Sequence, residues 1–270
     1  MKTLLLLAVL LAPLAAHDSD RHWQVEDQET IHRSYAGGTG HKLVVDNFAG
    51  AIHVAGGGSQ IEVTLVRHNR AESAEKLAEA KREVTLEISA QGGEVKLHQD
   101  YHHGNHRGDE EGYRVEFDYD IQVPAGTALW LGNFNSEIAV KGTSGDFNLH
   151  TFNGHIEVND VTGAGSVDTF NGPVKIAFRR NPEQDLKVKT FNGAVDAYFQ
   201  PGLNAELSYK TFNGGVFSDF DVAAAASVSG GGTKYVYHGG RSGSGRIGQG
   251  GPKLEFEGFN GPIRLHEAKS

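Results

Sequence analysis

The sequence predicts an all-β protein, a β-solenoid or β-helix-like stack of coils of about 18–21 residues with one short helix in its N-terminal part. Thr-Phe-Asn-Gly occurs four times, at residues 151–154, 169–172, 190–193 and 211–214. An imperfect copy, Asn-Phe-Asn-Ser, lies at 133–136. From there onward the Phe-to-Phe steps are 152 − 134 = 18, 170 − 152 = 18, 191 − 170 = 21 and 212 − 191 = 21. Between these corners apolar residues alternate with polar ones, which is typical of strands with one buried face.

Residues 1–16 have the pattern of a secretory signal peptide, with one early Lys, a short apolar run and a small-residue exit at Ala16. No later stretch approaches the roughly 20 apolar residues of a membrane-spanning helix. We therefore expect a bacterial protein that is exported, to the periplasm or the extracellular space, and soluble. The chain has no Cys, which excludes disulfides and thiolate metal sites, and its net charge of −9 argues against nucleic acid as a partner.

Residues 17–40 are polar and weakly patterned, and we expect a flexible leader there. Residues 41–126 form a β segment that contains the helix, at 70–83, where Ala74, Leu77 and Lys81 recur at helical spacing. This helix is expected to cap the end of the solenoid or to cross one face. A hairpin turning at 91–93 and an alternating strand from Tyr113 to Val123 complete the segment.

Residues 127–270 form the Asn-Gly repeat segment, continuous with the preceding one. Each repeat has an incoming strand, an Asn-Gly corner and an outgoing strand, and the corner suits Asn and Gly because both tolerate positive φ. The gap between the last two copies leaves room for a degenerate coil at 234–237 and a glycine-rich loop at 239–251, before a last coil at 258–265. Stacked corners predict a hydrogen-bonded turn ladder. Its members are Asn153, Gly154, Asn171, Gly172, Asn192, Gly193, Asn213, Gly214, Asn260 and Gly261.

The coil pattern Val/Leu-x-Thr-x-Asn-Gly-x-Ile/Val-x-Val/Ile resembles the bacterial adhesin-like β-solenoid family, whose members are mostly domains of unknown function. The order of an early strand pair, a short helix, a strand ending Val123-Pro124 and then Asn-Gly coils is similar over residues 41–266. The resemblance implies a non-catalytic adhesin-like module and permits a link to envelope-stress regulation. This chain departs from the family pattern by placing Phe before Asn in nearly every copy.

These Phe residues are the most distinctive candidate site. If strict alternation continues to the corner, Phe170 lies opposite Val167 and Thr169, and the rings form an exposed interaction stripe. If the chain bends at Thr-Phe, the rings form a stacked core, and we favour that arrangement because exposed aromatic stripes are costly in a soluble protein. The candidate stripe consists of Phe134, Phe152, Phe170, Phe191, Phe212 and Phe259.

Other motifs point to no defined chemistry. The His-rich loop from His98 to His106 could bind a metal, but nothing in it holds ligands on a rigid element. An N-terminal His17 after signal cleavage could chelate copper only with a second positioned His. The G-x-G-x-x-G match at 243–248 lacks the flanking strand and helix of a dinucleotide site and is expected to be a loop. We therefore expect no catalytic residues, no cofactor and no metal.

The leading interpretation is a non-catalytic binding or structural module that contacts a glycan, another envelope protein or a copy of itself. Two alternatives remain open. One is a β-helix enzyme acting on polysaccharide, which requires two carboxylates held about 5–9 Å apart across a substrate. The other is an accessory protein in envelope-stress signalling.

Overall fold

The computed structural model describes residues 23–101, 112–224, 237–238 and 242–269. These residues form two open sheets of eleven strands each, with mixed parallel and antiparallel pairing, and one helix, α1 (Ala74–Glu83). The prediction of an all-β protein with one short helix is therefore confirmed for the described chain. The predicted signal peptide lies outside the described residues.

The first sheet contains, in spatial order, β1, β4, β7, β3, β9, β11, β13, β15, β22, β17 and β19. Their bounds are β1 (Val25–Tyr35), β4 (Ile61–Ala71), β7 (Tyr113–Val123), β3 (Ile52–Gly56), β9 (Ile138–Lys141), β11 (Ile156–Val161), β13 (Val174–Phe178), β15 (Val195–Phe199), β22 (Ile263–Glu267), β17 (Gly215–Ser218) and β19 (Tyr237–His238).

The second sheet contains, in spatial order, β18, β20, β16, β21, β14, β12, β10, β8, β2, β6 and β5. Their bounds are β18 (Val222–Ala224), β20 (Ser242–Ile247), β16 (Ala205–Asn213), β21 (Lys253–Asn260), β14 (Leu186–Asn192), β12 (Gly165–Asn171), β10 (Phe147–Asn153), β8 (Ala128–Asn135), β2 (Lys42–Ala49), β6 (Glu94–Tyr101) and β5 (Val84–Gln91).

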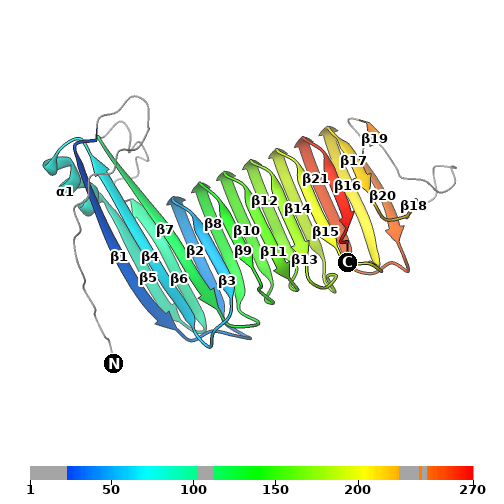
Figure 1. Cartoon of the computed structure of the whole chain (residues 1–270), viewed down its shortest axis with the longest axis horizontal. Coiled ribbons are helices and arrows are strands. Elements are labelled where there is room, and N and C mark those ends of the chain that lie inside the picture. Colours follow the sequence, from blue (N-terminus) through cyan, green and yellow to red (C-terminus); the bar gives the residue numbers. More distant parts are fainter. Residues whose placement is uncertain (1–22, 102–111, 225–236, 239–241, 270) are drawn as a thin grey trace.

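Along the repeats the chain alternates between the sheets, so β8, β10, β12 and β14 lie in the second sheet and β9, β11, β13 and β15 in the first. Equivalent positions of successive repeats pair in parallel and in register, as Thr151 with Thr169 and Ile156 with Val174. Figure 1 shows these strands stacked side by side along the long axis of the molecule. The predicted incoming and outgoing strands of each repeat are thus present.

The core lies between the two sheets, where alternate residues of both form one buried cluster. β7 shows the alternation clearly: Val115, Phe117 and Tyr119 are buried, whereas the residues between them are partly exposed. Burial of one face of each strand supplies most of the stability of such a structure.

At the N-terminal end, α1 connects β4 of the first sheet to β5 of the second (Figure 1). Ser73 caps the helix by accepting a hydrogen bond from the backbone N–H of Lys76 at 3.3 Å, so the helix starts four residues later than predicted. The buried Arg67 of β4 donates to the Ala80 carbonyl at 3.1 Å, which fixes the helix on the sheet. The predicted hairpin is present as β5 and β6, with a turn at Gly92 and Gly93.

The prediction of a flexible leader is wrong for β1, which pairs antiparallel with β4 over its whole length. Its residues alternate weakly because one face is only partly buried and β1 is an edge strand of the sheet. Polar and charged side chains such as Glu26, Glu29 and Arg33 are typical of such an edge, since they discourage pairing with other chains.

The order of the last coils also differs from the prediction. β21 and β22 do not end the stack: β21 lies between β14 and β16, and β22 between β15 and β17. The predicted glycine-rich loop is wrong for residues 242–247, which form β20 and pair antiparallel with β16. Most of the predicted degenerate coil, residues 234–236, lies outside the described residues.

Candidate interaction face

Seven Phe rings form a continuous stack along the outer side of the second sheet. Neighbouring ring centroids are 4.5–5.0 Å apart and neighbouring ring planes differ by only 1–5°. We call this stack the Phe column. In spatial order it consists of Phe48, Phe134, Phe152, Phe170, Phe191, Phe259 and Phe212.

The rings point outward because the preceding threonine points inward. Thr151, Thr169 and Thr190 are at most 2 % exposed. Each donates its hydroxyl hydrogen to a corner carbonyl of the preceding repeat at 3.0–3.1 Å, so the buried hydroxyl keeps a partner. Strand alternation then continues through the Phe position. The favoured expectation of a stacked Phe core is therefore wrong: Phe170 is 39 % and Phe212 is 57 % exposed.

The corner Asn side chains form the column that the repeat predicts. The Nδ2 of Asn171 donates to Oδ1 of Asn153 at 2.8 Å, and Asn192 donates to Asn171 at 2.8 Å. The same contact joins Asn135 to Asn153, Asn192 to Asn260 and Asn260 to Asn213, at 2.7–2.9 Å. Between the ends of the column, Asn135 and Asn213, each amide thus both donates and accepts, which supports the close approach of the corners.

The corner glycines are required mainly by lack of space. A Cβ on Gly154, Gly193 or Gly214 would lie far inside van der Waals contact with the carbonyl oxygen of the neighbouring corner. Positive φ, which the sequence argument invoked, is found at Gly172 (+156°) and Gly261 (+142°), whereas none of the corner Asn residues adopts it. The close stacking of backbones therefore selects glycine at this position.

Two imperfect copies of the motif keep the inward side chain before Phe and the outward ring, but with Asn in place of Thr. Asn133 takes the place of the buried Thr and donates to the Gly50 carbonyl at 2.8 Å. Asn47 does the same one strand further and donates to the Phe117 carbonyl at 3.0 Å. Phe48, which the candidate stripe omitted, lies on Phe134 with centroids 5.0 Å apart. Its repeat signal was visible in Asn47-Phe48-Ala49-Gly50, but two residues of that copy differ from the motif.

A row of residues two positions before each Phe lies beside the Phe column on the same face, and we call it the second row. Trp130, two residues before Gly132 in β8, is 53 % exposed, and the Lys42 ammonium lies 4.7 Å from its ring centroid. Five of the seven exposed large apolar side chains of the described chain lie on this one face: Phe134, Phe170, Phe191, Phe212 and Trp130. In spatial order the second row is Asp46, Gly132, His150, Asp168, Lys189, Glu257 and Lys210.

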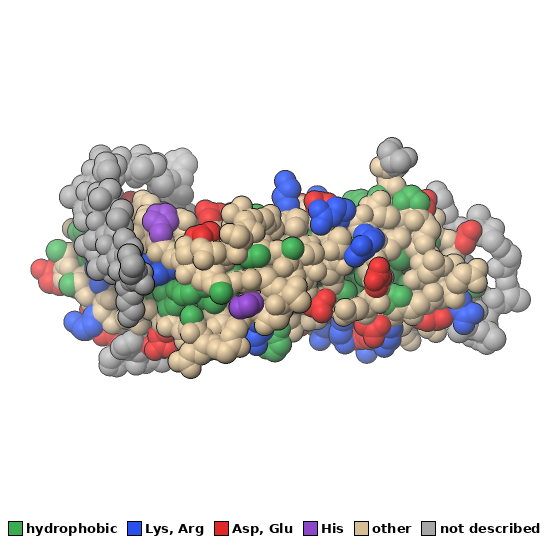
Figure 2. All heavy atoms as spheres, turned by 90° about the horizontal axis from the view of Figure 1, so that it is seen from below, with side chains coloured by type: hydrophobic (Ala, Val, Ile, Leu, Met, Phe, Trp, Pro, Cys, Tyr) green, Lys and Arg blue, Asp and Glu red, His purple; other side chains and the backbone are tan. Residues whose placement is uncertain are grey.

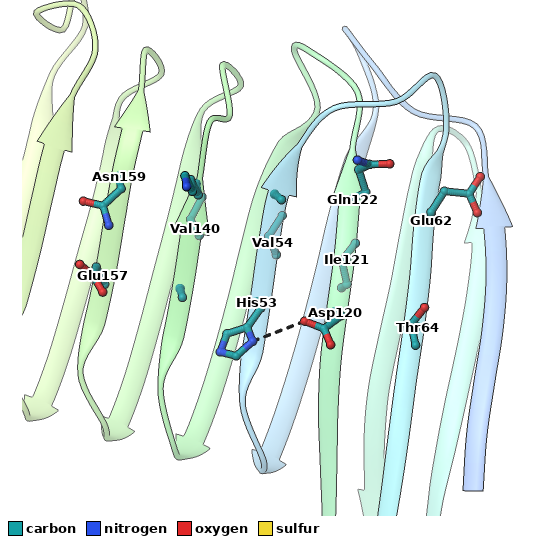
Figure 3. Close-up of a pocket in the computed structure, with 13 residues that line it drawn as sticks. His53, Val54, Glu62, Thr64, Asp120, Ile121, Gln122, Val140, Glu157 and Asn159 are labelled. Carbon is teal, nitrogen blue, oxygen red and sulfur yellow. Dashed lines mark ion pairs between the residues drawn. The ribbon is translucent and has the colours of Figure 1, made fainter.

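The opposite face, on the first sheet, carries a shallow groove of about 490 Å³ that spans β4, β7, β3, β9 and β11 (Figure 3). His53 points toward Asp120 there, with Nδ1 3.4 Å from the carboxylate, and its Nε2 lies 2.8 Å from Glu137. The hydrogen bond with Glu137 raises the pKa of His53 above its ordinary value. Glu157, also in the groove, has a lowered pKa because it accepts a hydrogen bond from Lys175 at 2.8 Å.

Several charged side chains of the repeat strands lie in ion pairs, such as Lys175 with Glu157 and Lys187 with Glu255. Figure 2, which views the molecule from below Figure 1, shows acidic and basic side chains lying close together over the repeat strands. A second groove, of about 460 Å³ on the second sheet, contains Glu255, whose pKa is lowered to about 2 by hydrogen bonds from Lys187 and Lys253. A general acid for glycoside cleavage needs the opposite shift, a raised pKa. Neither Glu157 nor Glu255 therefore meets that requirement.

No group of three or more His, Cys, Asp or Glu residues within the described ranges could hold a metal ion. His98, the first His of the predicted loop, lies in β6 and pairs with Asp46 at 3.0 Å. His102, His103 and His106 lie outside the described residues, as does His17. The G-x-G-x-x-G stretch at 243–248 is largely strand β20 and precedes no helix in the described chain.

Comparison with known proteins gives structural likeness only. No protein-family model matches the sequence, and no curated protein matches it. A crystal structure named "putative cell adhesion protein", from Clostridium sporogenes, is 11 % identical, with 89 % of this chain and 100 % of that chain covered and a TM-score of 0.48. A "putative adhesin" from Bacteroides fragilis is 8 % identical, with 88 % and 97 % covered and a TM-score of 0.36.

Among the described residues, no helix is both long and apolar enough to cross a membrane.

Proposed function

We propose that this chain is an exported β-solenoid protein of a bacterial envelope or the extracellular space, and that it acts as a non-catalytic binding module. Its contact surface is the Phe column together with the second row. Alternation of the repeats between two sheets, with parallel in-register pairing, supports the solenoid description.

The observation that carries the proposal is the outward position of the seven stacked rings. Large apolar patches on soluble proteins usually mark interaction surfaces, because exposed apolar area is unfavourable in water. Core packing does not require these rings, since the inward face of the same strands is already filled by residues such as Leu149, Val167 and Val188.

The geometry of the stack indicates which chemistry the surface can bind. A ring within the stack has both faces covered by its neighbours at 4.5–5.0 Å, so only its edge faces outward. A sugar stacks on the face of an aromatic ring, whereas a flat apolar ridge of ring edges suits another apolar protein surface. The proposed partner is therefore a protein.

The test compares wild type with Phe170→Ser and Phe191→Ser. We expect both variants to fold, by circular dichroism and thermal unfolding, and to lose association with protein partners in envelope fractions and with the chain itself. Phe217→Ser, which removes a 37 % exposed ring from β17 on the first sheet, serves as the control for loss of an exposed ring away from the Phe column. If both Phe variants unfold the protein or retain full association, the Phe column is a structural stack and the proposal fails.

The non-catalytic part of the proposal is tested separately. We expect no release of reducing ends or unsaturated products from envelope and extracellular polysaccharides incubated with the purified protein. Glu157→Gln and Glu255→Gln are the variants to compare if product is released. Turnover that either substitution abolishes would replace the binding module with an enzyme.

A further inference from the structure

We propose that the partner on this face is a second copy of the chain, in a two-fold symmetric dimer whose axis runs parallel to the strands and passes between β12 and β14. The inference rests on the proposed function, because both use the Phe column as contact surface. It adds the identity of the partner and the register of the contact.

The Phe column is straight enough for two copies to lie against each other along it over several strands. Sheets normally twist by about 20–25° from strand to strand, which limits contact between two flat faces. Here neighbouring rings of the Phe column differ in plane by only 1–5°. A straight ridge of this kind can be matched along its length by an identical straight ridge.

The second row is complementary to itself in the proposed register. Rotation about an axis parallel to the strands reverses the strand order, so β12 faces the partner's β14 and β10 faces the partner's β21. Asp168 then faces Lys189 of the second copy, and His150 faces Glu257. Each contact occurs twice because of the symmetry.

Other registers are worse by charge or by area. An axis through β12 places Asp168 against its own copy. An axis through β14 places Lys189 against itself and Asp168 against Glu257. An axis between β14 and β21 again pairs opposite charges but overlaps only the four rings from β12 to β16, whereas the proposed axis overlaps the six from β8 to β16.

The charges of this face balance, and two of its lysines are unpaired among the described residues. Within the described chain Lys189 and Lys210 form no ion pair, and Asp168 has only His150, at 3.9 Å. Glu257 lies 3.6 Å from Lys187 of its own chain. On β8, β10, β12, β14, β21 and β16, the second row and the positions two residues before it have a formal charge of 3 − 3 = 0, although the whole chain has −9. Two copies can therefore approach through this face with little repulsion. The six charged residues are Lys187, Lys189, Lys210, Asp168, Glu255 and Glu257.

Charge exchange tests the register. Sedimentation velocity of the full secreted chain over a concentration series gives the monomer–dimer dissociation constant. We expect Asp168→Lys and Lys189→Asp each to weaken the dimer at least about tenfold, and the double variant Asp168→Lys/Lys189→Asp to restore it to within about threefold of wild type. Lys141→Asp, on the first sheet, is the control and should leave the constant unchanged.

Disulfide cross-linking tests the same register without altering charge. Because the chain has no Cys of its own, only the introduced thiols can form a disulfide. A mixture of copies carrying Phe134→Cys with copies carrying Phe212→Cys should form a disulfide-linked mixed dimer on mild oxidation, because β8 faces the partner's β16. Neither variant alone should cross-link efficiently.

The outcomes separate the two proposals. A wild-type chain that stays monomeric at high concentration overturns the dimer, and the Phe170→Ser assay on other protein partners then decides the binding function alone. The proposed axis is overturned if the Phe variants abolish the dimer but the double variant Asp168→Lys/Lys189→Asp dimerises no better than its two single variants. A wild-type chain that neither self-associates nor binds another protein overturns both proposals.

Discussion

Phe259 stacks on Phe191 with ring centroids 4.5 Å apart and planes 5° apart, although 259 − 191 = 68 residues separate them. Phe212 lies on the other side of Phe259, at 4.7 Å. The last repeat of the sequence is thus inserted between two repeats that are consecutive in the chain. In-register pairing of Asn192, Asn260 and Asn213 keeps the corner column continuous across the insertion.

The inserted strand provides a direct comparison of its two faces. Phe256 is fully buried and Phe259 is partly exposed, and both lie in β21. We expect Phe256→Ala to lower the free energy of unfolding by about 3–5 kcal/mol, because it leaves a cavity in the core. Phe259→Ala should cost less than about half as much. Urea unfolding measures both, and equal losses would contradict the assignment of inner and outer faces.

Corner packing predicts an effect of a single methyl group. In Gly193→Ala the new Cβ would overlap the Gly172 carbonyl oxygen, and two corners would have to separate. We expect a loss of about 3 kcal/mol in the free energy of unfolding. Gly132→Ala is the matched control, since its Cβ would meet nothing closer than 3.7 Å and the cost should stay within about 0.5 kcal/mol. A tolerated Gly193→Ala would show that the corners are not so closely stacked.

The Asn column predicts a moderate and local contribution. Asn171→Ala removes two side-chain hydrogen bonds, to Asn153 and from Asn192. At about 0.5–1.5 kcal/mol per bond, we expect a loss of about 1–3 kcal/mol in thermal or urea unfolding. Asn148→Ala, an exposed Asn of β10 outside the column, should have little effect. Similar small effects for both variants would show that the column contributes nothing to stability.

The contact of His53 with Glu137 predicts that the free energy of unfolding depends on pH. Its hydrogen bond raises the folded-state pKa of His53 above the unfolded value of about 6.5. The resulting stabilisation is therefore fully present below about pH 6.5 and is lost as the pH rises through the raised pKa. The stability difference between wild type and Glu137→Gln should be larger at about pH 5.5 than at about pH 9, within the roughly 1 kcal/mol of an exposed pair.

An NMR titration of the His53 ring checks the cause directly. The pKa should lie above its ordinary value in wild type and fall in Glu137→Gln. An unchanged titration in that variant would assign the shift to another group, and Asp120, 3.4 Å from Nδ1, would be the next to replace.

Much of the fold could be predicted because its determinants are local. Alternation identified Tyr113–Val123, helix formers identified α1, and the repeated tetrapeptide identified strands, corners and the Asn column. The signals that failed were those in which local pattern is weak. β1 alternates poorly because it is a partly exposed edge, and β20 is rich in Gly and Ser, so both resembled loops.

The sequence by itself determined the repeat, the two alternating faces of the repeat strands and the position of their Asn-Gly corners. Only the tertiary structure decided that the Phe rings lie outside and that the last repeat sits inside the stack. Strand alternation cannot say whether a chain bends before or after the residue next to a corner, and here the buried Thr hydroxyls, each bonded to a neighbouring carbonyl, place the bend after Phe. Repeats with the same register can also pair in any order, so the order is selected by contacts between distant segments.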